Sequence, residues 1–184
     1  MIWVLVIVGL IVIVAIVLVA LYNRLVRYRN RVDNAWAQIE VQLKRRWDLI
    51  PNLVESVKGY AAHERETFEA VTQARTAAQQ AQGPAEAAQA EGILSQALGR
   101  LFAVAEAYPE LRATENFQQL QAQLAETENK VAVSRQVYND TVLTYHNAIQ
   151  TFPGAVLAGP FGFTTREFFQ VEDEAQREAP KVAF

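Results

Sequence analysis

Twenty consecutive residues near the start of the chain carry neither a charge nor a strongly polar side chain, and they constrain the fold more than any other feature. The stretch runs from Ile2 to Leu21 and reads IWVLVIVGLIVIVAIVLVAL. About 20 apolar residues in an α-helix are enough to cross the hydrocarbon core of a bilayer. We therefore predict a single membrane-spanning helix, with residues 1–23 as the anchor.

A cleaved signal peptide is the competing interpretation of an apolar stretch at the N-terminus. Signal peptides begin with basic residues, have a shorter apolar core and end at a cleavage site with small side chains. Here no Lys or Arg precedes the apolar stretch, and its end reads Leu21, Tyr22 and Asn23. These features favour an anchor that is not cleaved.

Basic residues gather on one side of the predicted span. Four arginines follow it, at positions 24, 27, 29 and 31, whereas none precedes it. Because positively charged flanks stay in the cytoplasm, we expect a single-pass protein of the bacterial inner (plasma) membrane, with its N-terminus outside and its bulk cytoplasmic. Tyr and Trp favour the headgroup region. The residues predicted to contact membrane lipid at the interface are therefore Trp3, Tyr22, Arg24, Arg27, Tyr28, Arg29 and Arg31.

Beyond the anchor, apolar residues recur at alternating intervals of three and four, which is the spacing of a seam between packed helices. In the first helix the seam runs from Val32 to Tyr60, and its main members are Trp36, Ile39, Leu43, Ile50, Leu53 and Val57. In the last helix, where Thr or Ser occupies three further positions, the members are Phe117, Leu120, Leu124, Val131, Tyr138, Tyr145 and Phe152. The first seam keeps its register through Pro51, so we predict a kink there and not a break.

Arg46 is the one charged residue in the first seam, and it belongs to a basic cluster with Lys44 and Arg45. At about 1.5 Å per residue, the cluster lies roughly 35 Å beyond the span, which is several Debye lengths from the headgroups. We therefore expect these side chains to serve the bundle, the solvent or a partner, and not lipid.

The remaining signals complete an all-α prediction. Apolar spacing loosens after the first seam until Gly83 and Pro84 mark a turn, and a second helix then runs from about residue 85 to a stop before Pro109. We predict an N-terminal single transmembrane helix that continues into a cytoplasmic antiparallel bundle of long helices over residues 24–170.

The end of the chain changes composition twice. Residues 153–170 are rich in Phe and Gly and too apolar to hang free, so we expect them to pack on the bundle or on a neighbouring subunit. Acidic residues dominate beyond this segment and bury little surface, so residues 171–184 are predicted to be a disordered acidic tail.

Reactive and metal-binding patterns are weak. The chain has no Cys, which excludes disulfides and thiolate chemistry. His63 and Glu64 begin like a zinc-protease motif, but Thr67 stands where the second His is required, and His146 is expected to be an ordinary bundle or surface residue. With a net charge of −3 and no basic excess, a nucleic-acid partner is not expected either. We predict no metal, no cofactor and no enzymatic activity.

Three segments of the chain resemble the LemA family. The first contains YNRLV from Tyr22 and then RVDNAWAQIEVQLKRRWDLIPNLVESVKGYAAHE. The second, from Ala107 to Pro153, reads AYPELRATENFQQLQAQLAETENKVAVSRQVYNDTVLTYHNAIQTFP, and the third is the closing GFTTREFFQ. The resemblance implies a bacterial inner-membrane protein with an outside N-terminus and a cytoplasmic helical bundle. It implies no catalytic residue, and proposals for the family range from membrane-associated scaffolding to membrane-protein quality control.

Two functional hypotheses follow from these observations. In the first, the chain is a membrane-anchored scaffold or assembly protein at the cytoplasmic face of the membrane that self-associates as a homo-oligomer. In the second, it is an adaptor or regulator of another membrane protein, such as a quality-control protease, and uses the same helical faces. An enzyme would need a polar constellation inside the bundle, for which Thr127, Ser134, Thr141 and the tyrosines are the only material.

Overall fold

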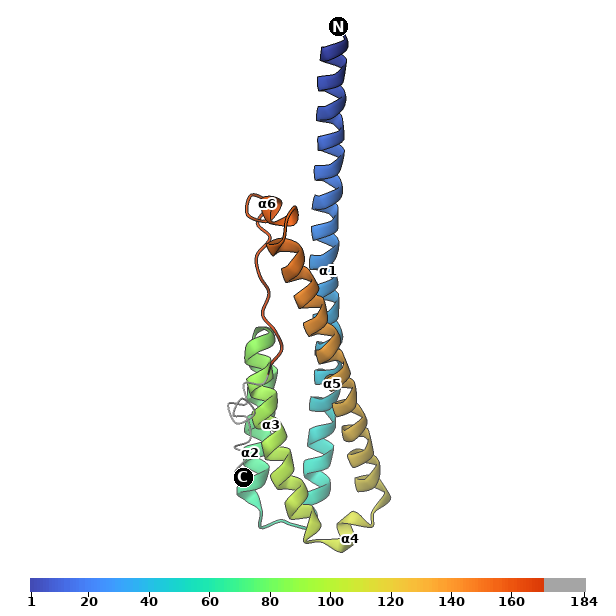
Figure 1. Cartoon of the computed structure of the whole chain (residues 1–184). Coiled ribbons are helices and arrows are strands. Elements are labelled where there is room, and N and C mark those ends of the chain that lie inside the picture. The colour runs from blue at the N-terminus through green and yellow to red at the C-terminus, as the bar shows by residue number, and fades with distance from the viewer. Residues whose placement is uncertain (171–184) are drawn as a thin grey trace, which may run out of the picture. The chain divides into compact units, whose positions relative to one another are not determined.

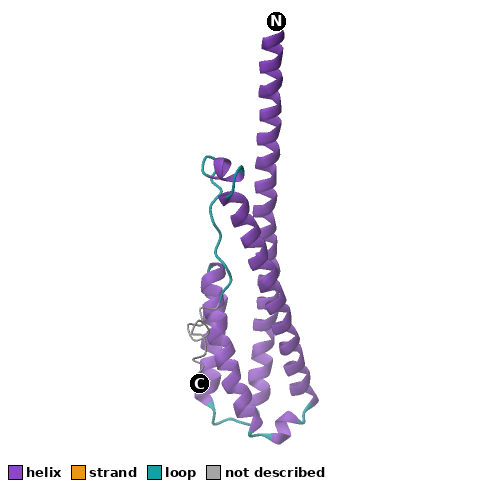
Figure 2. Ribbon diagram, in the orientation of Figure 1, coloured by secondary structure: helices purple, strands orange, loops and turns teal. Residues whose placement is uncertain are grey.

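The computed structural model describes residues 1–170, and regular secondary structure within this part of the chain is helical throughout. The predicted all-α fold is therefore confirmed (Figure 2). The predicted tail, residues 171–184, lies outside the described residues. In chain order (Figure 1) the elements are α1 (Ile2–Lys58), α2 (Arg65–Gln80), α3 (Gly83–Glu106), α4 (Pro109–Arg112), α5 (Glu115–Gln150) and α6 (Gly154–Ala158).

The longest element, α1, is a helix of 57 residues that begins with the apolar stretch and passes through Pro51 without a break. A proline inside a helix cannot donate the hydrogen bond to the carbonyl four residues earlier. That carbonyl belongs to Trp47, and it accepts a hydrogen bond from Nε of Arg75 at 2.8 Å. A side chain of α2 therefore replaces the donor that Pro51 lacks.

The chain folds as two compact units, and α1 and α5 each contribute to both. The first unit consists of Met1–Ile39 and Ser134–Arg166, in which the end of α5 runs antiparallel to α1 (Figure 1). The ring of Trp36 packs on that of Tyr138, with 5.6 Å between the centroids. The larger buried side chains of this unit are Leu25, Val32, Ile39, Tyr138, Val142, Tyr145, Ile149, Leu157 and Phe163.

Polar contacts hold the segment after α6 along the first unit. Tyr145 Oη donates a hydrogen bond to the carbonyl oxygen of Thr164 at 2.9 Å, and burial raises the pKa of Tyr145, which favours the protonated form that donates. The backbone N–H of Arg166 donates to Nε2 of His146 at 2.9 Å, and its guanidinium pairs with Asp33 at 3.0 Å. This part of the Phe-rich segment therefore packs on the bundle.

The second unit consists of Glu40–Val133 and the segment from Glu167. The rest of α1, the antiparallel pair of α2 and α3, and the first half of α5 enclose a single apolar core. Phe169, close to the end of the described chain, is also buried. The larger core residues are Ile50, Leu53, Val57, Phe68, Val71, Leu94, Leu98, Leu101, Leu111, Phe117, Leu120 and Leu124.

The first helix ends earlier than the apolar pattern predicts. The pattern loosens without a stop before the Gly83–Pro84 turn, whereas α1 ends at Lys58 and a separate helix, α2, begins at Arg65. The chain leaves α1 at Gly59, and glycine is a poor helix residue. The amide of Ala61, which is buried, still donates to the carbonyl of the last seam residue of α1. The break allows α2 to fold back along the core.

We expect the turn between α5 and α6 to depend on a glycine. A Cβ atom at Gly154 would overlap the carbonyl oxygen of Ala148, whereas a Cβ at Gly159 would meet nothing within 4 Å. Gly154→Ala should therefore destabilise the full chain by about 1–3 kcal/mol, as overpacking does. Thermal unfolding followed by circular dichroism in detergent measures this effect. Gly159→Ala is the matched control, and equal melting temperatures for the two variants would contradict the expectation.

Candidate functional site

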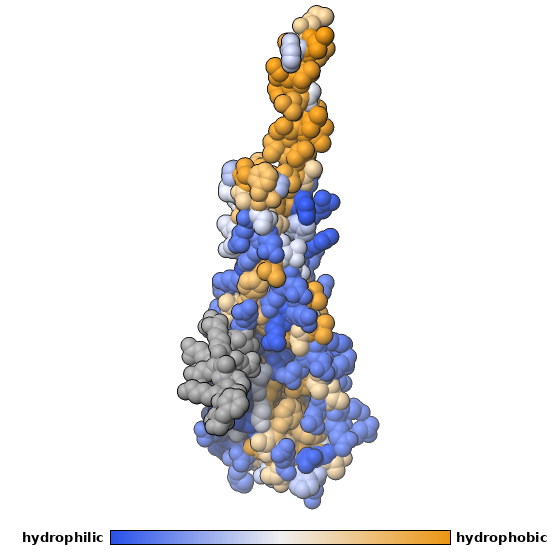
Figure 3. Space-filling view, viewed as in Figure 1, coloured by the Kyte–Doolittle hydropathy of each residue, from blue (hydrophilic) through white to orange (hydrophobic). Residues whose placement is uncertain are grey.

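The N-terminal stretch of α1 is an apolar surface that no other part of the described chain covers. Exposed fractions among the large apolar side chains from Ile2 to Val19 run from 43% at Leu18 to 80% at Trp3, and Figure 3 shows the stretch as a mostly hydrophobic surface. Twenty residues at 1.5 Å each give about 30 Å, the thickness of the hydrocarbon core. Among the described helices, α1 is the one that is long and apolar enough to cross a membrane. It is a candidate anchor.

Two of the predicted interface arginines that follow the candidate span meet at one tyrosine, Tyr28. Arg24 Nε donates a hydrogen bond to Tyr28 Oη at 3.1 Å. The guanidinium groups of Arg24 and Arg31 lie 5.5 and 5.8 Å from the centroid of the Tyr28 ring, within the range of cation–π attraction. Arg27 is exposed, and Trp3 lies at the opposite end of the span. The structure therefore brings three of the seven predicted residues into contact.

Two phenylalanines from the segment after α6 join these residues. The ring of Tyr22 lies 5.1 Å from that of Phe161 and 5.7 Å from that of Phe163. The guanidinium of Arg29 lies 5.5 Å from the Phe163 centroid. We call this group of aromatic and basic side chains the collar, which consists of Tyr22, Arg24, Tyr28, Arg29, Arg31, Phe161 and Phe163.

A cavity of about 190 Å³ opens beside the collar. The hydroxyl of Thr151 at its wall donates to the carbonyl oxygen of Asn147 at 2.6 Å. Arg24 is the charged residue among those that line the cavity. The cavity thus combines one cation with walls that are polar and apolar in about equal measure. Its lining residues are Leu21, Arg24, Leu25, Ala148, Thr151, Phe152, Pro153 and Gly154.

The predicted seam residues occupy different environments. Trp36 and Val131 are half-buried. Phe152 does not belong to the seam, because its side chain is 84% exposed. The reason is that α5 ends at Gln150, so the helical spacing no longer applies at position 152, and Ile149 takes the last buried position. The buried members are Ile39, Leu43, Ile50, Leu53, Val57, Phe117, Leu120, Leu124, Tyr138 and Tyr145.

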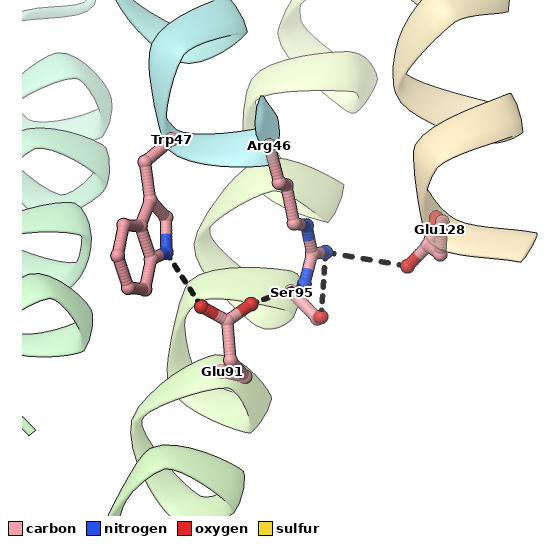
Figure 4. A network of polar contacts seen from close by, with 5 residues as sticks. All are labelled: Arg46, Trp47, Glu91, Ser95 and Glu128. Atoms are coloured by element: carbon pink, nitrogen blue, oxygen red, sulfur yellow. Dashed lines mark hydrogen bonds and ion pairs between the residues drawn. The ribbon is translucent and has the colours of Figure 1, made fainter. Parts of the chain in front are cut away.

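A buried ion pair lies within the second unit (Figure 4). Arg46 and Glu91 are 4% and 5% exposed, and Arg46 Nη1 donates to Glu91 Oε2 at 2.6 Å. Arg46 Nη2 donates to Ser95 Oγ at 2.9 Å and to Glu128 Oε1 at 3.3 Å. Trp47 Nε1 donates to the other oxygen of Glu91 at 2.6 Å. The network therefore connects α1, α3 and α5.

This network connects three helices, and its central ion pair between Arg46 and Glu91 is buried. Each carboxylate oxygen of Glu91 accepts a hydrogen bond from α1, and the side chain is enclosed. A buried charge is tolerated when it is paired and hydrogen-bonded, although the buried Nε of Arg46 has no hydrogen-bond partner within the described residues. The network therefore fixes the positions of α1, α3 and α5 along one another.

Sequence reasoning singled out Arg46 but missed its buried partner. Lys44 and Arg45, its neighbours in the basic cluster, are exposed. Glu91 was missed because its surroundings in the chain are rich in Ala and Gly. A usable signal was nevertheless present, since Glu91 continues the spacing of three and four set by Leu94 and Leu98.

The two histidines provide no metal centre in the described structure. His63 is exposed, and Nε2 of His146 accepts a backbone hydrogen bond from Arg166. Within residues 1–170, no three His, Asp or Glu side chains gather as a metal site would require.

Comparison with known proteins gives consistent matches. A model described as the LemA family matches residues 35–184. The chain is 29% identical to Magnetosome protein MamQ 2 of Paramagnetospirillum magneticum, over 81% of this chain and 64% of that protein. It is 27% identical to Magnetosome protein MamQ of Magnetospirillum gryphiswaldense, with 80% and 64% covered, and 27% identical to Protein LemA of Metamycoplasma hominis, with 71% and 60% covered. The chain thus spans slightly less than two thirds of the length of these relatives.

Removing the buried cation should be costly. Arg46→Met leaves Glu91 charged and buried with one remaining donor, so we expect a loss of about 3–5 kcal/mol in the free energy of unfolding. Arg46→Met combined with Glu91→Gln removes both charges and keeps an acceptor for Trp47, so it should recover much of the loss. Urea unfolding of the full chain in detergent measures both, with exposed Arg45→Met as the control. A cost for Arg46→Met no larger than the control would contradict the role of the pair.

The substitute donor for Pro51 predicts an energetic coupling between two helices. Arg75→Met should cost about 1 kcal/mol, because the Trp47 carbonyl loses its partner. In a Pro51→Ala background the amide at position 51 supplies the normal helical hydrogen bond, so Arg75→Met should cost less. A double-mutant cycle from urea unfolding gives the coupling, with exposed Arg65→Met as the control. Equal costs in both backgrounds would refute it.

Proposed function

The chain belongs to the LemA family, and from this premise we propose that it acts as a membrane-anchored helical scaffold that assembles with further copies of itself. The observation that carries the proposal is the continuity of α1. One helix supplies the exposed apolar stretch and then core residues of both units. Such a helix holds a bundle at a bilayer with every copy in one orientation, and a protein of this design presents surfaces to partners.

We propose that the anchor crosses the bacterial inner membrane once, with the N-terminus outside and the bundle in the cytoplasm. The four arginines that follow the span support this orientation, because positively charged flanks favour the cytoplasmic side. Membrane lipid is then the first partner of the chain, and the collar faces the headgroups on the cytoplasmic side.

A role without catalysis is supported by two further observations. The relatives are named as magnetosome proteins and as LemA, and these names state no reaction. The charged groups of the buried network are engaged with one another between helices. Both observations fit a protein whose function lies in its surfaces.

We place the contact between copies on an exposed face of α1 in the second unit. Val41 is 64% exposed, and Lys44 and Arg45 follow it by about one helical turn and are exposed as well. The side chains of Glu126 and Glu128 are 55% and 60% exposed on α5, where they also pair with Lys130 and Arg46 of the same chain. A two-fold symmetric contact would bring the basic face of each copy to the acidic side chains of the other. Confinement to one membrane raises the effective concentration of these faces.

Native mass spectrometry after gentle extraction from the membrane tests the proposal. We expect a discrete multiple of the 20.6 kDa chain. Lys44→Glu with Arg45→Glu should shift the complex to monomers through charge repulsion, whereas Arg65→Glu with Arg100→Glu, at other exposed positions, should not. A lone monomer for the unaltered chain would refute self-association. A stoichiometric second protein would instead support an adaptor of another membrane protein, such as a quality-control protease.

A further inference from the structure

The hairpin formed by residues 151–163, which we call the α6 hairpin, is apolar on two sides. Leu157 and Phe163 are buried in the first unit. Phe152, Val156 and Phe161 keep much of their surface exposed, at 84%, 62% and 55%. The hairpin therefore keeps a second apolar face that the first unit does not cover.

This face lies beside the end of the candidate span. The ring of Phe161 packs on Tyr22, with 5.1 Å between the centroids, and Tyr22 directly follows the apolar stretch. Phe152 lines the same cavity as Leu21, the last residue of that stretch. Figure 1 places α6 next to α1 where α1 extends beyond α5, and Figure 3 shows apolar surface on the hairpin adjoining that of α1. The exposed side chains are thus at the depth where the span would leave the hydrocarbon.

The distribution of charge around the hairpin favours an anionic lipid surface. No Asp, Glu, Lys or Arg occurs between Asp140 and Arg166, so insertion of the hairpin would desolvate no charged side chain. The arginines of α1 that follow the span, most of which belong to the collar, all precede Asp33, the first acidic residue after the span. This region is therefore positively charged. Interfacial segments bind membranes through buried apolar area together with attraction of basic residues to anionic headgroups, and both components occur here.

We propose that the α6 hairpin is a second membrane contact, which inserts Phe152, Val156 and Phe161 into the interfacial layer of the bilayer that α1 crosses. Arg24, at the wall of the adjoining cavity, binds a lipid phosphate. The inference rests on the proposed membrane anchor. A second contact point restricts rotation of the first unit about the axis of α1, which a single span does not do.

Because the chain contains no Cys, single cysteines carrying a fluorescent label report on one position each. The full chain is reconstituted into vesicles of phosphatidylglycerol and phosphatidylcholine. Val156→Cys reports on the hairpin and Ile11→Cys on the span. Val137→Cys, at an exposed position of α5 roughly 20 Å along the helix from its end, is the matched control. Quenching is measured with nitroxide-labelled lipid and, separately, with aqueous iodide.

We expect lipid quenching at position 156 to be at least about threefold stronger than at position 137, together with protection from iodide. Position 11 decides whether the anchor itself is inserted, so its failure to be quenched would overturn the proposed anchor and this inference with it. Strong quenching at 11 with an iodide-accessible label at 156 would overturn the hairpin contact alone. Protection of 156 from both quenchers would also overturn it and would assign the hairpin to a contact with a second copy.

Two further variants separate the apolar and the electrostatic contributions. Phe152→Ser in the Val156→Cys chain should reduce lipid quenching at position 156 by about twofold or more, whereas Leu143→Ser, an exposed change on α5, should not. Arg24→Gln should remove the preference for phosphatidylglycerol over phosphatidylcholine vesicles. Circular dichroism verifies that each variant is folded, and unchanged quenching in a folded Phe152→Ser chain would contradict the insertion of this face.

Discussion

A backbone that crosses a bilayer must satisfy its hydrogen bonds within itself, and α1, the candidate anchor, meets this constraint as one unbroken helix on which the rest of the structure depends. The helix does not end with the apolar stretch, so the direction of its first turns also determines the seam of the bundle. Leu25, which is 3% exposed, is already a core residue one turn after Leu21. Because α1 continues without a loop to Lys58, the other helices must fold back to pack against it. The end of α5 does so in the first unit, and α2 and α3 do so in the second.

Apolar seams alone leave helices free to slide, and the second unit contains directional bonds that oppose sliding. Two consecutive residues of α1 provide most of them. Arg46 reaches α3 and α5, while Trp47 donates through its indole to Glu91 and accepts at its carbonyl from Arg75 of α2. The carbonyl is available because Pro51 has no amide hydrogen. A residue that would weaken an isolated helix thus creates the acceptor that fixes α2 against α1.

The fold class was predictable because apolar spacing is a property of each helix by itself. The same property explains the failures. Spacing does not report where a helix stops, so the break at Gly59 was missed and Phe152 was assigned to a helix that ends at Gln150. Apolar spacing also does not indicate which helices pack against one another. Glu91 was within reach through its register with Leu94, but the contact of Tyr22 with Phe161 arises only when the chain has turned back at the end of α5.

The α6 hairpin combines two apolar faces through local geometry. Gly162 has a φ of +69°, a conformation that favours glycine, and it separates Phe161, which faces outward, from Phe163, which is buried. The consecutive α6 residues Val156 and Leu157 differ in the same sense, because Val156 is exposed and Leu157 is buried. If the hairpin only closed the core, its exposed apolar side chains would not stabilise the fold. Apolar surface left in water lacks the stabilisation of about 25 cal/mol per Å² that burial provides. These exposed side chains become favourable if the hairpin meets a second apolar medium, and the neighbouring end of α1 is where a bilayer would provide one.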